Sequence, residues 1–94
     1  MINAQGKSIV VSESTVISAT AARILGVSIK AGTDTATVKL LDGGSSGTQK
    51  TLTISVTSVA TPIHWEFANG IQCATGIYAT ITGTTPEVAV EFEN

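Results

Sequence analysis

Few residues in this chain carry side chains that can act as acid, base, nucleophile or metal ligand. The 94-residue sequence contains one histidine, His64, and one cysteine, Cys73. A zinc site of the usual histidine and cysteine composition needs more ligands of these types than one chain supplies. A serine nucleophile needs a positioned base, and we expect His64 to lie exposed on a strand, opposite in phase to Trp65. We therefore predict that the protein is not an enzyme, with no catalytic, metal or cofactor-binding residues.

The carboxylates are dispersed as well. They fall in predicted turns, at Asp34 and Asp42, or on the outer face of the last predicted strand, at Glu87, Glu91 and Glu93. We interpret the two aspartates as solvated turn residues, and the glutamates as charges that keep an edge strand from pairing with other chains. Calcium needs several oxygen ligands that converge from loops, and no Asp-rich spacing indicates such a site. The sequence thus predicts no cation site.

Residues 42–47, Asp-Gly-Gly-Ser-Ser-Gly, form the segment most suited to a flexible loop. The glycines permit positive φ, and the aspartate and serines can bond to their own backbone. The segment lacks the Lys-Ser or Lys-Thr ending of a phosphate-binding loop and begins no predicted helix. Cys73, which has no partner for an internal disulfide, is expected to pack as a small hydrophobic side chain.

The composition excludes several classes of partner. Charged residues make up 13% of the chain and aromatic residues 4%, the net charge is −2, and the 5 Lys and Arg residues stand singly. This pattern gives no basic surface for nucleic acid. No segment has the apolar length of a signal peptide or membrane span, so we expect no membrane partner and synthesis in the cytoplasm. A chain of this length builds one core, so residues 1–94 are predicted to form a single, marginally stable domain that gains from oligomerisation.

Alternation of apolar and polar residues with a period of two is the dominant pattern, and turn residues interrupt it at the spacing typical of sandwiches and barrels. It predicts about eight strands, in an all-β antiparallel β-sandwich of the jelly-roll or Greek-key type. The connection order stays open. Nine segments show the alternation, and we expect about eight strands from them: 8–12, 15–19, 23–30, 35–41, 50–57, 63–67, 71–74, 76–82 and 87–93.

The alternation also predicts which side chains face the core. We expect these to be Leu25, Val27 and Ile29 in one strand, Leu52, Ile54 and Val56 in another, and Val88, Val90 and Phe92 in the last. Trp65 and Phe67 are expected to anchor the core. Leu41 falls on the outer face of its strand, where it is either covered or exposed. Asn69-Gly70 is a dipeptide favoured in type I′ hairpins and predicts a tight turn. Residues 1–7 are expected to be a frayed terminus or a flexible arm.

The order of several segments resembles a known group of proteins. The segments are Leu25-Gly26-Val27-Ser28-Ile29, Ala36-Thr37-Val38-Lys39-Leu40-Leu41-Asp42-Gly43 and Gly76-Ile77-Tyr78-Ala79-Thr80-Ile81-Thr82-Gly83. Over residues 20–92 the chain resembles small virion proteins of tailed bacteriophages, such as capsid decoration (cement) proteins. The resemblance implies a structural protein on the capsid surface of the virion that binds and stabilises the shell of major capsid protein. By analogy it also implies a homo-oligomer, for which we expect a trimer.

Two other functions remain open at this point. A phage tail, fibre or head-spike module that binds host surface glycan would need an exposed aromatic platform, and Tyr78 is its one plausible member in the sequence. A β-sandwich module attached to a larger bacterial enzyme or adhesin would have a similar composition. The sequence contains no motif that separates these alternatives from a capsid protein.

Overall fold

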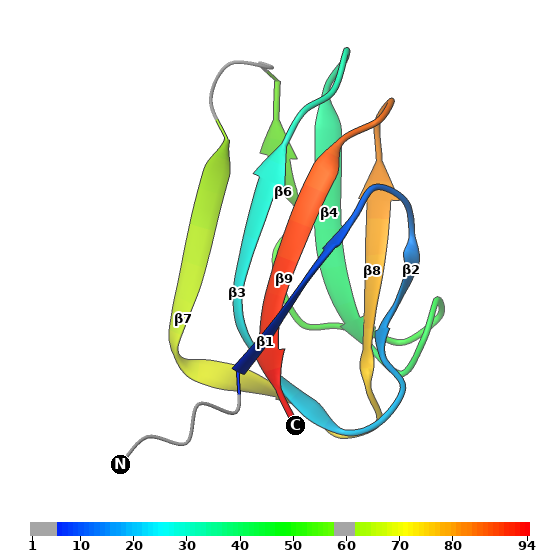
Figure 1. Ribbon diagram of the computed structural model, residues 1–94. Coiled ribbons are helices and arrows are strands. Elements are labelled where there is room, and N and C mark those ends of the chain that lie inside the picture. The colour runs from blue at the N-terminus through cyan, green and yellow to red at the C-terminus, as the bar shows by residue number, and fades with distance from the viewer. Residues whose placement is uncertain (1–5, 58–61) are drawn as a thin grey trace.

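Two antiparallel sheets pack face to face in the computed structural model, which describes residues 6–57 and 62–94 (Figure 1). The predicted all-β sandwich is confirmed. Within the part of the chain that is described, no helix is long and apolar enough to cross a membrane. The strands are β1 (Gly6–Val11), β2 (Thr15–Ser18), β3 (Ala22–Lys30), β4 (Ala36–Asp42), β5 (Thr48–Gln49), β6 (Ile54–Val56), β7 (Ile63–Cys73), β8 (Ile77–Thr82) and β9 (Glu87–Glu93).

The strand order follows from one long antiparallel ribbon folded over on itself. The first sheet has the order β1-β9-β3-β7, and the second has the order β2-β8-β4-β5, with β6 also paired to β4. The pairs β1–β9, β2–β8, β3–β7 and β4–β6 are nested from the chain ends inward, and successive pairs lie in alternate sheets. This is the connectivity of a jelly roll, which the sequence alone left open.

The core between the sheets is almost entirely aliphatic. Inward side chains of β3, β4 and β9 are fully buried, among them Ile24, Leu40 and Val90, each 0% exposed. The inward alternation predicted for β9 is confirmed, because Val88, Val90 and Phe92 are all buried. Since the only cysteine is unpaired, this packing holds the two sheets together without a disulfide.

A bulge in β3 changes the predicted alternation there. Ile24 pairs with Phe92 of β9 and the next pair joins Gly26 to Glu91, so Leu25 has no partner in the β9 ladder. An extra residue of this kind reverses the facing of the residues that precede it. Ile24 therefore faces the core together with Val27 and Ile29, whereas Leu25 is only half-buried and its predicted core position is wrong.

β7 is one bent strand, so the hairpin turn predicted at Asn69-Gly70 is wrong. Ile24 pairs with Ile71 and Gly26 pairs with Glu66, which leaves residues 67–70 of β7 opposite Leu25 alone. Gly70 has a φ of +73° in this bulge, and a Cβ on it would lie 2.3 Å from the Arg23 side chain. The Asn-Gly dipeptide therefore supplies the bend, visible where β7 turns sharply in Figure 1, instead of a connection between two strands.

The strand predicted at 50–57 is interrupted. Within this segment only β6, in the second half, pairs with another strand, and Ile54 and Val56 face inward as predicted. Leu52, which was also predicted to face inward, is 72% exposed. Thr51, which was predicted to face outward, is buried, and its Oγ1 accepts a hydrogen bond from the Leu40 N–H at 3.1 Å. A side-chain oxygen thus takes the place of a ladder carbonyl, and the chain leaves the regular strand path at this point.

Three further expectations have clear outcomes. Trp65 does not anchor the core, because β7 is an edge strand and the indole remains 42% exposed, whereas Phe67 packs partly against the core. Leu41 is covered: it lies on the outer face of β4 between Gln49 and Tyr78 and is 5% exposed. Of the predicted arm 1–7, residues 1–5 lie outside the described residues, and residues 6 and 7 already belong to β1.

A comparison of Leu40 in β4 with Leu52 in the interrupted segment tests which leucine lies in the core. Replacing Leu40 by Ala should lower the free energy of unfolding by about 2–5 kcal/mol, because the side chain is fully enclosed. The same change at Leu52 should cost less than about 0.5 kcal/mol, because that side chain is largely in solvent. Urea denaturation followed by circular dichroism measures both values. Equal losses would contradict the arrangement of residues 50–53 described above.

Candidate functional site

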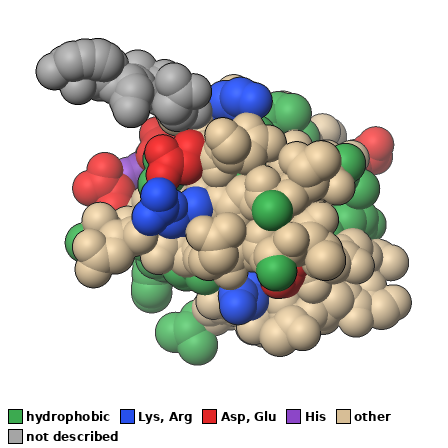
Figure 2. All heavy atoms as spheres, turned by 90° about the horizontal axis from the view of Figure 1, so that it is seen from below, with side chains coloured by type: hydrophobic (Ala, Val, Ile, Leu, Met, Phe, Trp, Pro, Cys, Tyr) green, Lys and Arg blue, Asp and Glu red, His purple; other side chains and the backbone are tan. Residues whose placement is uncertain are grey.

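The outer face of the first sheet carries a compact polar cluster, which we call the His64 cluster. It comprises Ser28 of β3, His64 and Glu66 of β7, and Glu91 of β9. The Ser28 Oγ and His64 Nδ1 atoms are 2.6 Å apart, and His64 Nε2 lies 3.6 Å from Glu66 Oε2. One ligand atom from each of His64, Glu66 and Glu91 lies within 4.8 Å of the other two. Figure 2 shows the histidine flanked by acidic side chains on one edge of the surface.

Strand register brings these side chains together. His64 pairs with Ser28, while Gly26 pairs with Glu66 on one side and with Glu91 on the other. β7 and β9 are second neighbours, separated by about 9.6 Å, so their side chains meet only if the strand between them leaves space. Gly26 leaves that space: a Cβ on it would lie 2.8 Å from Glu91 Oε1. The bulge at Leu25 sets this register and thereby creates the cluster.

The Ser28–His64 contact resembles the first step of a nucleophile–base arrangement, since the hydroxyl and imidazole lie within hydrogen-bond distance. Acyl transfer also requires backbone or side-chain donors aimed at the developing oxyanion. β3 pairs with β7 on one side and with β9 on the other, so its backbone lies within two antiparallel ladders. At the position of the hydroxyl, Ser28 is paired with His64 on one side and with Ala89 on the other. Metal binding suits the geometry better than acyl transfer.

Two aspartates brace both ends of the β4–β8 pair. The Asp42 carboxylate accepts hydrogen bonds from the N–H groups of Ala74 and Thr75, each at 2.9 Å, and from Thr75 Oγ1 at 2.7 Å. At the other end Asp34 accepts from the N–H and Oγ1 of Thr84, at 2.7 and 3.1 Å. These two Asp–Thr clamps give the predicted turn residues a structural role that goes beyond solvation.

Hydrogen bonding favours the ionised form of Asp42. The Thr75 and Ala74 donors stabilise the ionised form and lower the pKa of Asp42 from 3.8 to about 2. The following residues make a turn in which Gly43 and Gly44 have φ values of +105° and +98°, and the Gly47 N–H donates to the Gly44 carbonyl at 2.9 Å. The glycine-rich segment is thus a structured turn beside the Asp42 clamp.

The other candidate residues are dispersed. Cys73 is 0% exposed in the core, as predicted, and burial raises the pKa of its thiol. β9 lies between β1 and β3, so the prediction that its glutamates protect an edge strand is wrong. Glu93 instead pairs with Arg23, with an Nη2–Oε2 distance of 2.7 Å. Sequence spacing could not reveal the His64 cluster, because its members meet only through the register of three strands.

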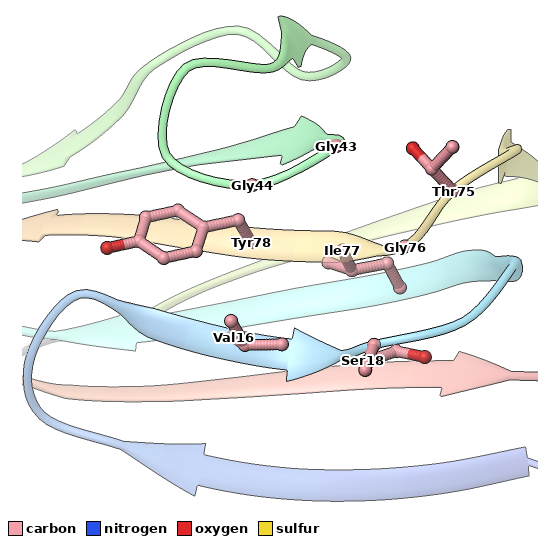
Figure 3. Close-up of a pocket in the computed structure, with 9 residues that line it drawn as sticks. Val16, Ser18, Gly43, Gly44, Thr75, Gly76, Ile77 and Tyr78 are labelled. Carbon is pink, nitrogen blue, oxygen red and sulfur yellow. The ribbon is translucent and has the colours of Figure 1, made fainter.

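A shallow hollow of about 350 Å³ lies on the second sheet beside Tyr78. Val16 of β2 and Tyr78 of β8 line it together with Gly43 and Gly44, as Figure 3 shows. Tyr78 pairs with Val16 on one side and Leu41 on the other, and its side chain is half-buried. The residue that the sequence offered as an aromatic platform is therefore partly covered, whereas Trp65 is the more exposed aromatic side chain.

Comparison with known proteins leaves the fold and the side-chain geometry as the basis for function. No family model matches the chain, and no curated protein or solved structure matches it either. The jelly-roll connectivity is shared by viral capsid, lectin and cupin domains, so by itself it separates none of these functions. The exposed surface and the His64 cluster carry the arguments that follow.

The lowered pKa of Asp42 predicts a specific acid sensitivity. Because the folded pKa of about 2 lies below the ordinary value of 3.8, the ionised clamp stabilises the fold above about pH 4, and this stabilisation is lost as the pH falls through 2. Asp42→Asn should be less stable than the parent at pH 7, and the difference should shrink towards pH 2. Urea unfolding at several pH values measures it, with the exposed Glu87→Gln as control. A difference independent of pH would contradict the role of the carboxylate charge.

Burial of Cys73 predicts low thiol reactivity. Ellman's reagent should modify the native protein slowly, because the thiol is enclosed and its pKa is raised. In guanidinium the same thiol should react as fast as a model peptide. Absorbance at both conditions measures the two rates. Rapid modification of the native protein would place Cys73 outside the core.

Proposed function

We propose that the protein is a capsid decoration (cement) protein of a tailed bacteriophage, which binds the outer surface of the major capsid protein shell and stabilises it. It acts on the virion after synthesis in the host cytoplasm, as a homo-oligomer for which a trimer is the expected form. The proposal involves no catalytic step. It rests on the resemblance of residues 20–92 to such proteins, on the jelly-roll connectivity and, above all, on one feature of the surface.

That feature is an apolar flank formed by β1 and β2. These strands are the edges of the first and second sheet on the same side of the sandwich, where a short connection joins them (Figure 1). Val10, on the outer face of the first sheet, and Val16, on the outer face of the second, are 65% and 52% exposed, while Ile9, on the inward side of β1, is 38% exposed. An edge strand has one unpaired side, where its backbone groups can form hydrogen bonds with another chain. Exposed apolar side chains on such a strand also favour contact, because the contact buries them. We call these two edge strands, with Ile9, Val10 and Val16, the β1–β2 flank.

The binding mode suits a repeating shell. Burying a valine or isoleucine side chain contributes roughly 1.5–3 kcal/mol, so a few such contacts per copy give modest affinity. An oligomer that engages several subunits at once multiplies this affinity without further contacts. A rigid sandwich with a small share of charged residues loses little conformational entropy and repels its neighbours weakly.

A glycan-binding tail or head-spike module is the second candidate, and Trp65 is the observation that favours it. The indole is 42% exposed at the edge strand β7, where its sequence neighbours His64 and Glu66 extend from the opposite face of the strand. Aromatic rings with a free face and nearby polar groups suit amphipathic ligands. The two functions use opposite flanks of the molecule, so point variants can separate them.

Binding to capsid shells tests the proposal. The major capsid protein encoded nearest to this gene is assembled into empty shells, and the shells are sedimented with the purified protein. We expect saturable binding, and we expect Val10→Lys and Val16→Lys each to weaken it about tenfold or more, the equivalent of 1.4 kcal/mol. Leu52→Lys, at a comparably exposed position on the opposite flank, should bind as the parent does.

Three outcomes would count against the proposal. Absence of shell binding would contradict the decoration function, and unchanged binding of both valine variants would move the contact away from the β1–β2 flank. Glycan binding that is lost in Trp65→Ala would favour the second candidate. Sedimentation velocity of the free protein and of the shell-bound form tests the expected trimer.

A further inference from the structure

The His64 cluster has the donor set of a cation site. It offers one imidazole nitrogen and two carboxylates, from His64, Glu66 and Glu91, on the outer face of the first sheet. His64 and Glu66 are two residues apart on β7, so their side chains leave the same face of the strand. Glu91 reaches them from β9 across Gly26. β3 places no side chain between the donors at this point, because Gly26 has none.

The spacing of the donors fits a small divalent ion. Zinc forms bonds of about 2.0–2.2 Å to imidazole nitrogen and carboxylate oxygen, which puts neighbouring ligands in a tetrahedral site roughly 3.4 Å apart. His64 Nε2 lies 3.6 Å from Glu66 Oε2, and all three ligand atoms lie within 4.8 Å of one another. Small rotations of the exposed Glu66 and the half-buried Glu91 side chains complete the geometry.

The other ring nitrogen of His64 is held as in a metal ligand. His64 Nδ1 and Ser28 Oγ are 2.6 Å apart, so an N–H on Nδ1 can donate to the serine hydroxyl. This tautomer leaves the Nε2 lone pair directed towards Glu66. Hydrogen bonding of the second nitrogen is what usually orients a metal-binding histidine and raises its basicity.

The charges around the cluster also favour a cation. Within residues 6–57 and 62–94 the ion pairs are Arg23–Glu93 and His64–Glu66, so no lysine or arginine of these residues pairs with Glu66 or Glu91. Two carboxylates held close together repel each other unless a positive charge lies between them. A divalent ion at this position would remove the repulsion and link β7 to β9 across β3.

We propose that His64, Glu66 and Glu91 bind a divalent transition-metal ion, with zinc as the best match, and that Ser28 and Gly26 position the ligands. The nitrogen ligand disfavours magnesium and calcium, which prefer oxygen donors. The fourth coordination position is open to solvent, since His64 and Glu66 are exposed. This revises the expectation of no metal site, which considered sites of histidine and cysteine or closely spaced aspartates.

Isothermal titration of the full chain with zinc chloride, after removal of any histidine tag, tests the site. We expect one ion per chain, and a rise in the melting temperature because the ion binds the folded state. His64→Ala, Glu66→Gln and Glu91→Gln should each weaken zinc binding about tenfold or more, and Ser28→Ala should weaken it by about tenfold. Gly26→Ala should weaken it as well, since the new Cβ meets Glu91 Oε1.

Matched controls keep the test specific. Glu87→Gln removes a carboxylate from the same strand but outside the cluster, and should leave zinc affinity unchanged. Cobalt, used in place of zinc, should give visible absorption bands that disappear in His64→Ala, and magnesium should give no binding heat. Circular dichroism confirms that each variant is folded. Absence of zinc binding by the parent protein would overturn the proposal, whatever the outcome of the capsid experiments. Zinc binding by Glu66→Gln and Glu91→Gln as tight as that of the parent would overturn it as well.

Discussion

The register of β3 against its two neighbours is the constraint on which the rest of the first sheet depends. β3 pairs with β9 and β7 along its whole length, but the pairing shifts on both sides at Leu25. The shift lets Ile24 and Val27 face the core together although they are three residues apart. It also bends β7, whose residues 67–70 lie opposite a single residue of β3. Without this bulge Gly26 would not lie between Glu66 and Glu91, and the His64 cluster would not form.

The second sheet depends on a different device. Its central pair, β4 and β8, is closed at each end by an Asp–Thr clamp, so that the turns are tied to the strands they follow. Short sheets lose stability by fraying at their ends, and charge-assisted hydrogen bonds to backbone N–H groups oppose this. The clamp at Asp42 also fixes the glycine-rich turn in the middle of the folded ribbon, where β4 leads to β5. A chain without disulfides thus stabilises its most polar turns by side-chain hydrogen bonds.

Alternation was sufficient to predict the strands whose neighbours on both sides are regular. β4, β8 and β9 have the predicted ranges to within one residue, and β9 has the predicted facing, because each lies inside a sheet and one side of each is buried. It failed where facing depends on a partner strand: Leu25 at the bulge, Leu52 where Thr51 replaces a ladder bond, and Trp65 on an edge strand. The His64 cluster could not be predicted for the same reason, since it also depends on partner strands. Ser28 and His64 are 36 residues apart in sequence, so no local pattern could place them in contact.

The two flanks of the sandwich differ in how their edge strands are protected, and this difference limits what each can do. On one flank β7 carries His64 and Glu66, and charged or polar side chains on an edge discourage pairing with another chain. The sequence suggested such protection for β9, but β9 is an interior strand, and the protecting residues are on β7. On the other flank β1 and β2 carry exposed valine and isoleucine side chains, with Lys7 as the one charged residue of these two strands. The proposed contact with a capsid subunit is therefore physically favoured at the β1–β2 flank, and the proposed cation at the His64 cluster would link β7 to β9 without obstructing that contact.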